Sequence, residues 1–153
     1  MHKFLSALVL AVALGGFAST VAAWPSSVQE SSTLSEAEKE FYGAMNIYHG
    51  YVGTKPEQIA KMLNLTIIRV EKAQGIEKES LKPNSALLSE IESALDMLKA
   101  HQHLSKADAH FAKNETTRGY QELNTACRYA DKVPELVDAH VRQICKKGDK
   151  SRT

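Results

Sequence analysis

Apolar residues recur every three to four positions along most of the chain after residue 33, the spacing that gathers them on one face of an α-helix. In the segment 34–48 this face consists of Leu34, Ala37, Phe41, Ala44, Met45 and Tyr48. In the segment 54–75 it consists of Ile59, Met62, Leu63, Thr66, Ile67, Val70 and Ala73. The pattern predicts two amphipathic helices, separated by the glycine-containing run 49–53.

Polar residues at the ends of these segments indicate where the helices begin and end. Ser35 and Glu38 have the spacing of a capping box, in which each side chain accepts a backbone N–H of the other residue. The run 54–57 has the same spacing, with Pro56 in the first turn, where its missing N–H has no cost. Gly75 is predicted to end the second helix as its C-cap.

The longest predicted helix follows Pro83, with Asn84 or Ser85 as its cap, and runs to about Lys113 before turning at Asn114. Its first half has an apolar face made of Leu87, Leu88, Ile91, Leu95 and Leu98. Its second half has a differently oriented one made of Met97, Ala100, Leu104, Ala107 and Phe111. We therefore expect this helix to contact different neighbours along its length. The remaining side is predicted to be a charged, solvated face containing Glu92, Asp96, Lys99, His103, Lys106, His110 and Lys113.

Two further helices are predicted, from about Thr117 to Ala130 and from Pro134 to a stop at Gly148. The buried face of the last one would contain Val133, Val137, Val141 and Ile144. No pair of strands is visible, so the fold class is all-α, a compact four- to five-helix bundle in residues 34–148. Residues 149–153 are predicted to be a disordered basic tail.

The first 23 residues have the composition of a secretory signal peptide: a short basic start, an apolar run from Phe4 to Leu14, and small residues before Trp24. The Ser-rich segment 24–33 is predicted to be a disordered lead-in. We therefore expect an exported protein, periplasmic or secreted, and the Ala-rich apolar run favours the periplasm. In a eukaryotic secretory pathway, Asn64 and Asn114 would be glycosylation acceptors.

Removing residues 1–23 leaves 153 − 23 = 130 residues, enough for one domain with its own core. It also removes one of 19 basic residues, Lys3, and none of the 18 acidic ones, so the charges balance. A balanced charge gives no electrostatic basis for binding nucleic acid. No later apolar run approaches the length of a membrane span, so we expect no transmembrane segment in the mature chain.

Two cysteines in an exported chain predict one disulfide, Cys127 to Cys145. If 117–147 were one helix, the two would lie up to about 27 Å apart, and a tight hairpin near Lys132 would still leave an axial offset of roughly 12 Å. A bridge within the chain therefore needs two helices that cross at a wide angle, or a first helix that ends near Cys127. Otherwise free thiols or a bridge between two chains are expected.

Three of the chain's six histidines fall between residues 101 and 110. His103 and His110 share a helix face but are separated by roughly 10.5 Å of rise, so they cannot bind one metal ion together. His101 lies between the two apolar faces, where a hydrogen-bonded interior histidine is more common than a metal ligand. An alternative haem or metal site would combine Met45, His101 and His140 from different helices.

The sequence contains no nucleophile elbow, phosphate-binding glycine loop or zinc-protease motif. We therefore expect a small exported binding or interaction protein without catalytic activity or a cofactor, of the chaperone, inhibitor, immunity or regulatory type, with another protein as its partner. The alternative is a periplasmic haem- or metal-binding helical bundle. Tyr42 and Tyr51, which lie off the buried face of the first helix, are the predicted partner contacts because tyrosine is enriched in interfaces.

Overall fold

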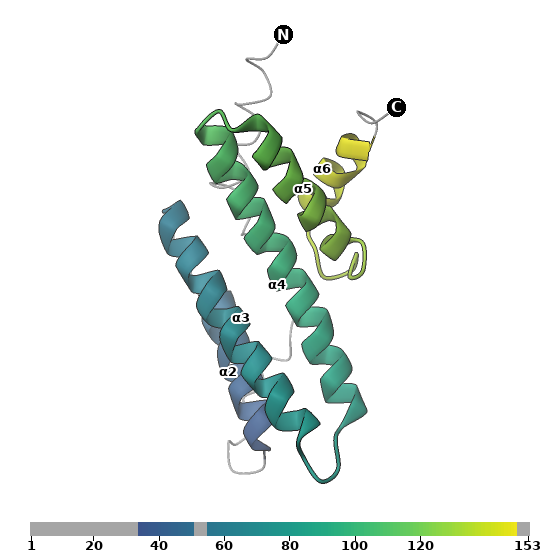
Figure 1. The fold of residues 1–153 in the computed structure, drawn as a ribbon. Helices are drawn as coiled ribbons and strands as arrows, with labels where there is room; N and C mark the ends of the chain where they lie inside the picture. Colours follow the sequence, from purple (N-terminus) through teal and green to yellow (C-terminus); the bar gives the residue numbers. More distant parts are fainter. Residues whose placement is uncertain (1–33, 51–54, 150–153) are drawn as a thin grey trace.

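The computed structural model describes residues 34–50 and 55–149, and this part of the chain contains five helices and no strand (Figure 1). The helices are α2 (Glu36–Gly50), α3 (Pro56–Lys78), α4 (Ser85–Ala112), α5 (Thr116–Ala130) and α6 (Ala139–Asp149). The predicted all-α fold is confirmed. The predicted signal peptide and lead-in, residues 1–33, lie outside the described residues, as do Tyr51 and nearly all of the predicted tail.

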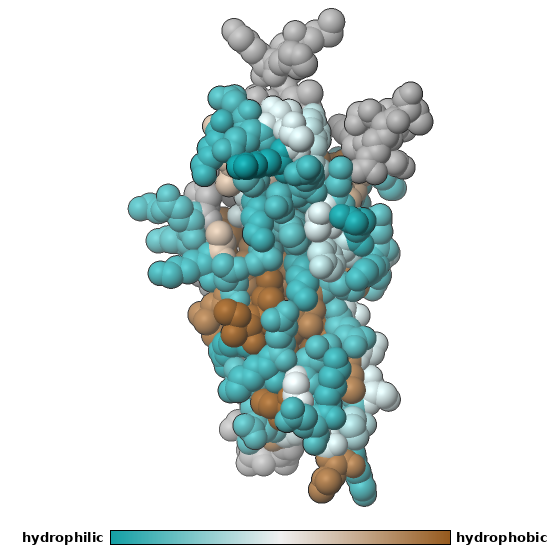
Figure 2. Space-filling model, in the orientation of Figure 1, coloured by the Kyte–Doolittle hydropathy of each residue, from teal (hydrophilic) through white to brown (hydrophobic). Residues whose placement is uncertain are grey.

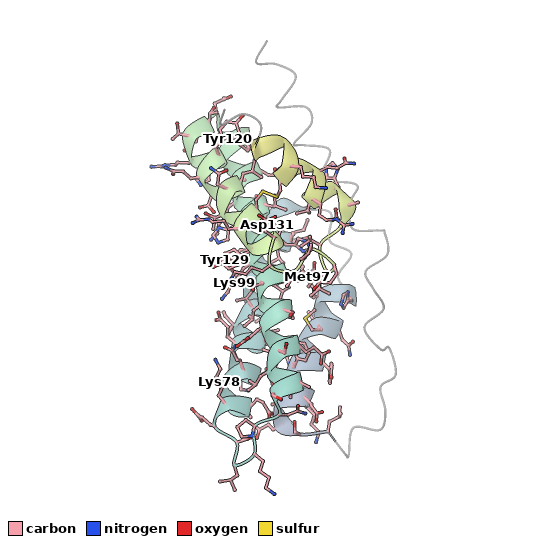
Figure 3. The ribbon with its side chains drawn as sticks, turned by 90° about the vertical axis from the view of Figure 1, so that its right-hand side faces the viewer. Lys78, Met97, Lys99, Tyr120, Tyr129 and Asp131 are labelled. Carbon is pink, nitrogen blue, oxygen red and sulfur yellow. A yellow bond between two sulfur atoms is a disulfide. The ribbon has the colours of Figure 1, made fainter. Side chains whose placement is uncertain are left out.

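Helix α4 is the central element, and its 28 residues correspond to a length of about 42 Å. Figure 1 shows α2 and α3 on one side of it and α5 with α6 on the other. In Figure 3, Lys78 and Tyr120 lie toward opposite ends of the molecule and Met97 lies between them. The first half of α4 contacts α2 through Glu90, and the second half contacts α5 through His103. The prediction that α4 meets different neighbours along its length is therefore confirmed.

The core is formed by the predicted apolar faces of the helices. Its largest fully buried side chains are Phe41, Met45, Leu63, Ile91, Met97, Leu98, Val70 and Thr66. Burying one large apolar side chain stabilises a fold by about 1.5–3 kcal/mol, so these residues hold α2, α3 and α4 together. The polar member, Thr66, donates its hydroxyl proton to the backbone carbonyl of Met62 at 3.0 Å, which removes the penalty of burying it unpaired.

Two of the predicted helix starts are confirmed. The backbone N–H of Glu38 donates to Ser35 Oγ at 3.1 Å, and the N–H of Ser35 donates to Glu38 Oε2 at 2.7 Å, which completes the capping box of α2. Asn84 caps α4, because its Oδ1 accepts the N–H groups of Ala86 and Leu87 at 3.0 and 3.2 Å. These contacts satisfy N–H groups that have no partner within the helix.

Two predictions about α3 are wrong. Its N-cap is Lys55, one residue after the predicted cap, and Lys55 makes no side-chain cap hydrogen bond. Gly75 does not end the helix, which continues to Lys78. The physical reason for the extra turn lies in Glu77, which is buried and whose Oε1 accepts the backbone N–H of Asn84 at 2.6 Å. This bond joins the end of α3 to the start of α4.

The turn between α4 and α5 is short and brings the start of α5 close to the end of α4. Asn114 adopts a φ of 60°, the left-handed conformation that Asn tolerates better than most residues. Gly119, in the first turns of α5, faces the ring of Phe111, and a Cβ atom there would lie 2.5 Å from the Phe111 Cε1 atom. The missing side chain therefore lets α5 return close against the end of α4.

The last helix begins later than the sequence predicts. Residues 131–138 form a non-helical connection, and α6 starts at Ala139 rather than Pro134. Asp138 caps it, because its Oδ1 accepts the N–H groups of His140 and Val141 at 2.8 and 2.9 Å. Val133, Val137 and Val141 are nonetheless buried, so three of the four predicted apolar residues belong to the core although two of them lie in a connection; the fourth, Ile144, is half-buried.

Candidate functional site

The predicted disulfide forms within the chain. Cys127 and Cys145 are joined, with their Cα atoms 5.4 Å apart. Helix α5 ends at Ala130, three residues after Cys127, and the connection 131–138 brings α6 back beside it. Helix α5 ends where the sequence predicts, so the route in which the first helix ends early is not the one observed. The start of α6 at Ala139 instead of Pro134 lets Cys145 lie beside Cys127, and neither free thiols nor a bridge between chains is needed in this fold.

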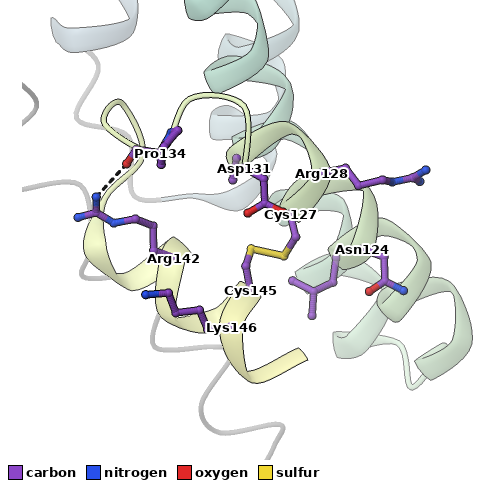
Figure 4. A pocket seen from close by; sticks show the side chains of 10 residues that line it. Asn124, Cys127, Arg128, Asp131, Pro134, Arg142, Cys145 and Lys146 are labelled. Atoms are coloured by element: carbon purple, nitrogen blue, oxygen red, sulfur yellow. Dashed lines mark hydrogen bonds between the residues drawn. A yellow bond between two sulfur atoms is a disulfide. The ribbon is translucent and has the colours of Figure 1, made fainter. Parts of the chain in front are cut away.

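A pocket of about 400 Å³ lies beside the disulfide (Figure 4). Its lining includes Arg128, Arg142 and Lys146 together with Asp131. The two guanidinium groups point to opposite sides of it in Figure 4. One donates to Thr125 Oγ1 at 3.2 Å and the other to the Pro134 carbonyl at 2.8 Å. The cations therefore do not converge on a shared point at which an anion could bind.

The side of α4 predicted to be a solvated charged face is exposed at Glu92, Lys106 and Lys113 but is paired with its neighbours at its other positions, which corrects that prediction in part. His103 Nδ1 lies 2.5 Å from Glu122 Oε2 on α5, and its ring stacks on that of Tyr129 with centroids 5.7 Å apart. Asp96 Oδ1 accepts from Lys132 Nζ at 3.1 Å. The carboxylate and the aromatic ring on α5 complement the polar side of α4, so this side becomes part of a helix–helix contact.

The other two histidines of this helix are also engaged. His110 Nδ1 lies 2.6 Å from Glu115 Oε2, across the turn between α4 and α5. His101 Nδ1 lies 2.5 Å from the hydroxyl oxygen of Tyr48 on α2, and the two rings stack with centroids 6.0 Å apart. The prediction of His101 as a hydrogen-bonded interior histidine agrees with this contact.

Burial decides the protonation of the Tyr48–His101 pair. It lowers the pKa of His101, while the negative charge of Asp138 acts in the opposite direction. It also raises the pKa of Tyr48, and the same aspartate adds to that shift. Because both shifts favour the neutral forms, the Tyr48 hydroxyl and Nδ1 of His101 form a hydrogen bond between two uncharged groups. The contact joins α2 to α4, and the α5–α6 connection lies within electrostatic range of it.

Residues of the alternative haem or metal site have different surroundings. Met45 is 2 % exposed and belongs to the core, His101 contacts Tyr48, and His140 is exposed in the first turn of α6. Across the described ranges, no group of three or more His, Cys, Asp or Glu side chains is placed to hold a metal ion.

Tyr42, one of the two predicted partner contacts, is only partly exposed. Its hydroxyl donates to Glu90 Oε2 at 3.3 Å, and its ring lies 5.1 Å from that of Phe41. Burial and the Glu90 charge raise the pKa of Tyr42. Contact with a partner through Tyr42 stays a prediction, as does contact through Tyr51, which lies outside the described residues.

An apolar surface patch that the sequence reasoning missed lies on α2 and α3. It consists of three large side chains that are 42, 53 and 62 % exposed, respectively Ile47, Leu65 and Ile68, and we call it the α2–α3 patch. Figure 2 shows hydrophobic side chains gathered over the region where Figure 1 draws the middle of α3. Single exposed apolar residues are common, but a cluster at one place on the surface is a candidate contact site.

The pairing of α2 with α3 places Ile47 and Leu65 opposite each other. Glu40 on α2 accepts from Arg69 at 2.9 Å and lies 3.5 Å from Lys72 Nζ on α3. The two helices run in opposite directions, so moving seven residues forward from Glu40 and seven back from Lys72 leads to Ile47 and Leu65. A step of seven residues returns to nearly the same helix face, so Ile47 and Leu65 lie at the same level and on the same side of the helix pair. Ile68, one turn after Leu65, extends the patch outward.

The signal that could have revealed the patch was present in the sequence. All three residues lie outside the apolar stripes that define the buried faces of their helices, so helical periodicity alone did not account for them.

The two predicted glycosylation acceptors lie on the surface, because Asn64 on α3 and Asn114 in the α4–α5 turn are both exposed.

None of the described helices combines the length and the apolar character that crossing a membrane requires. Comparison with known proteins found no matching family model, no matching curated protein and no matching solved structure.

Proposed function

We propose that this chain is a small exported binding protein without a catalytic role, of the chaperone, inhibitor, immunity or regulatory type, and that its α2–α3 patch contacts another protein. The observation that carries the proposal is the patch itself, formed by Ile47, Leu65 and Ile68. Helical bundles serve many functions, so the fold alone does not select this one, and the argument rests on the surface.

Covering the patch would stabilise a complex. The three side chains retain roughly half of their surface in water, so covering each one contributes about 1 kcal/mol on a scale where full burial contributes about 1.5–3. Exposed polar residues surround the patch on α3, including Lys61, Asn64 and Lys72. An apolar centre with a polar rim is the usual organisation of a protein interface.

Site-specific photo-crosslinking in the producing cell tests the proposal. A photoreactive amino acid is placed at Ile68, and the matched control carries it at Leu81, a fully exposed hydrophobic residue in the α3–α4 connection. We expect a discrete crosslinked product of higher mass from position 68 and none from position 81. Equal products from both positions, or no product from position 68, would contradict the proposed function.

A further inference from the structure

The α2–α3 patch lies within reach of the segment that precedes α2. Ile47 is 13 residues after Leu34, which corresponds to about 20 Å along a helix. The ten residues from Leu34 back to Trp24 span up to about 33 Å when extended. If the chain reverses direction before α2, Val28 can reach the level of Ile47, and Trp24 reaches it with length to spare.

The chemistry of this segment matches the surface. Residues 24–33 contain two large apolar side chains, Trp24 and Val28, and one charged residue, Glu30. The patch has a lysine at each end, since Lys61 precedes Ile68 by seven residues and Lys72 follows Leu65 by seven. An extended chain running back from Leu34 brings Glu30 about 13 Å along α2, near the level where Glu40 meets Lys72.

We propose that the segment 24–33 folds back over the α2–α3 patch, with Trp24 and Val28 against Ile47, Leu65 and Ile68, and that a protein partner must displace it. This inference rests on the proposed function, because it assigns the patch an occupant in the free protein. The segment is predicted to be disordered from its composition alone, and the patch supplies the apolar surface that its own sequence lacks. A large aromatic ring is also the side chain that gains most from such a contact.

The chain's tryptophan content makes the proposal directly testable. Trp24 is the only tryptophan, so tryptophan fluorescence reports on this residue alone, whether or not residues 1–23 have been removed. The protein is purified from the compartment to which the cell delivers it. Compared with the urea-unfolded chain, we expect its tryptophan emission to be blue-shifted and less quenched by acrylamide. Wild-type emission and quenching equal to those of the urea-unfolded chain would overturn the proposal.

Substitutions identify the surface that protects Trp24. Ile68→Glu places a negative charge in the patch and should abolish the blue shift and the protection, whereas the matched control Leu81→Glu should leave both unchanged. Ile68 is 62 % exposed, so the variant should keep its fold, which far-UV circular dichroism checks. Protection that survives Ile68→Glu would overturn the proposal. So would a blue shift lost on dilution together with a dimer mass, because a second copy would then cover the patch.

The two proposals fail in distinguishable ways. If Trp24 is exposed while position 68 still gives a crosslinked product, the inference is wrong and the proposed function stands. A protected Trp24 without any crosslinked partner supports the folding back of the segment 24–33 over the patch, and it removes both the proposed function and the displacement by a partner.

Discussion

Removing the Cys127–Cys145 disulfide should lower the free energy of unfolding by about 3 kcal/mol. The bridge joins residues 18 apart in the sequence, and a cross-link restricts the unfolded chain in proportion to the logarithm of the loop that it closes. For a loop of this size the lost chain entropy is about 11 cal/mol/K, which gives the figure above at 25 °C. The double variant Cys127→Ala, Cys145→Ala removes the bridge.

The fold indicates what happens to α6 in this variant. Outside the disulfide, the C-terminal part is held by Val133, Val137 and Val141, which are 3, 2 and 3 % exposed. Their burial should keep the connection and α6 in place at 25 °C, since full burial of each contributes about 1.5–3 kcal/mol. The change in stability should therefore come mainly from the unfolded state rather than from lost native contacts.

Urea unfolding followed by circular dichroism measures both quantities. We expect the extrapolated free energy to fall by about 3 kcal/mol while the dependence on urea, the m-value, stays nearly constant. Wild-type protein kept in a reducing agent is the control and should match the double variant. A loss below about 1 kcal/mol would refute the loop-closure reasoning, and a markedly smaller m-value would show that α6 has already detached.

Three further changes test other contacts. Gly119→Ala should destabilise the fold by about 1–3 kcal/mol, because its Cβ would lie 2.5 Å from the Phe111 ring, and an unchanged melting temperature would contradict the close approach of α5. Ser35→Ala should cost about 1 kcal/mol in the same assay through loss of the α2 cap. Because burial lowers the pKa of His101 below its usual 6.5, the unfolded chain takes up this proton first as the pH falls. The free energy of unfolding should therefore decrease below pH 6.5 by at most about 1.4 kcal/mol per pH unit, and urea unfolding of His101→Gln across this range should lack that component.

Local sequence signals predicted the helices whose ends depend on nearby residues. Ser35 with Glu38, and Asn84, provide caps within three residues of the N–H groups that they satisfy, so no knowledge of the tertiary fold was needed. The start of α6 was placed too early because Val133 and Val137 have helical spacing, yet both are buried in a connection. Periodicity reports which residues are buried and does not distinguish a helix from a turn that buries the same residues.

The surfaces were harder to predict than the helices because each depends on which elements meet. From the sequence alone, the polar side of α4 is expected to face solvent. In the fold, Glu122 and Tyr129 of α5 contact His103 on this side. In the same way, Leu65 and Ile68 are two apolar residues outside the buried face of α3. They can be recognised as part of a patch only when the alignment of α2 with α3 is known, because this alignment places Ile47 beside them. Pairing between helices is tertiary information, and one sequence carries it only weakly.

The extensive helix contacts of this protein join elements that follow one another in the chain: α2 with α3, α3 with α4, α4 with α5, and α5 with α6. Proteins whose contacts are mainly between sequence neighbours fold quickly, because little loop entropy is lost before contacts form. Each helical hairpin here can assemble as soon as its second helix has been made. Local unfolding should therefore begin at the first and last helices of the chain. Amide hydrogen exchange is expected to be slowest in α4, which has a partner on each side.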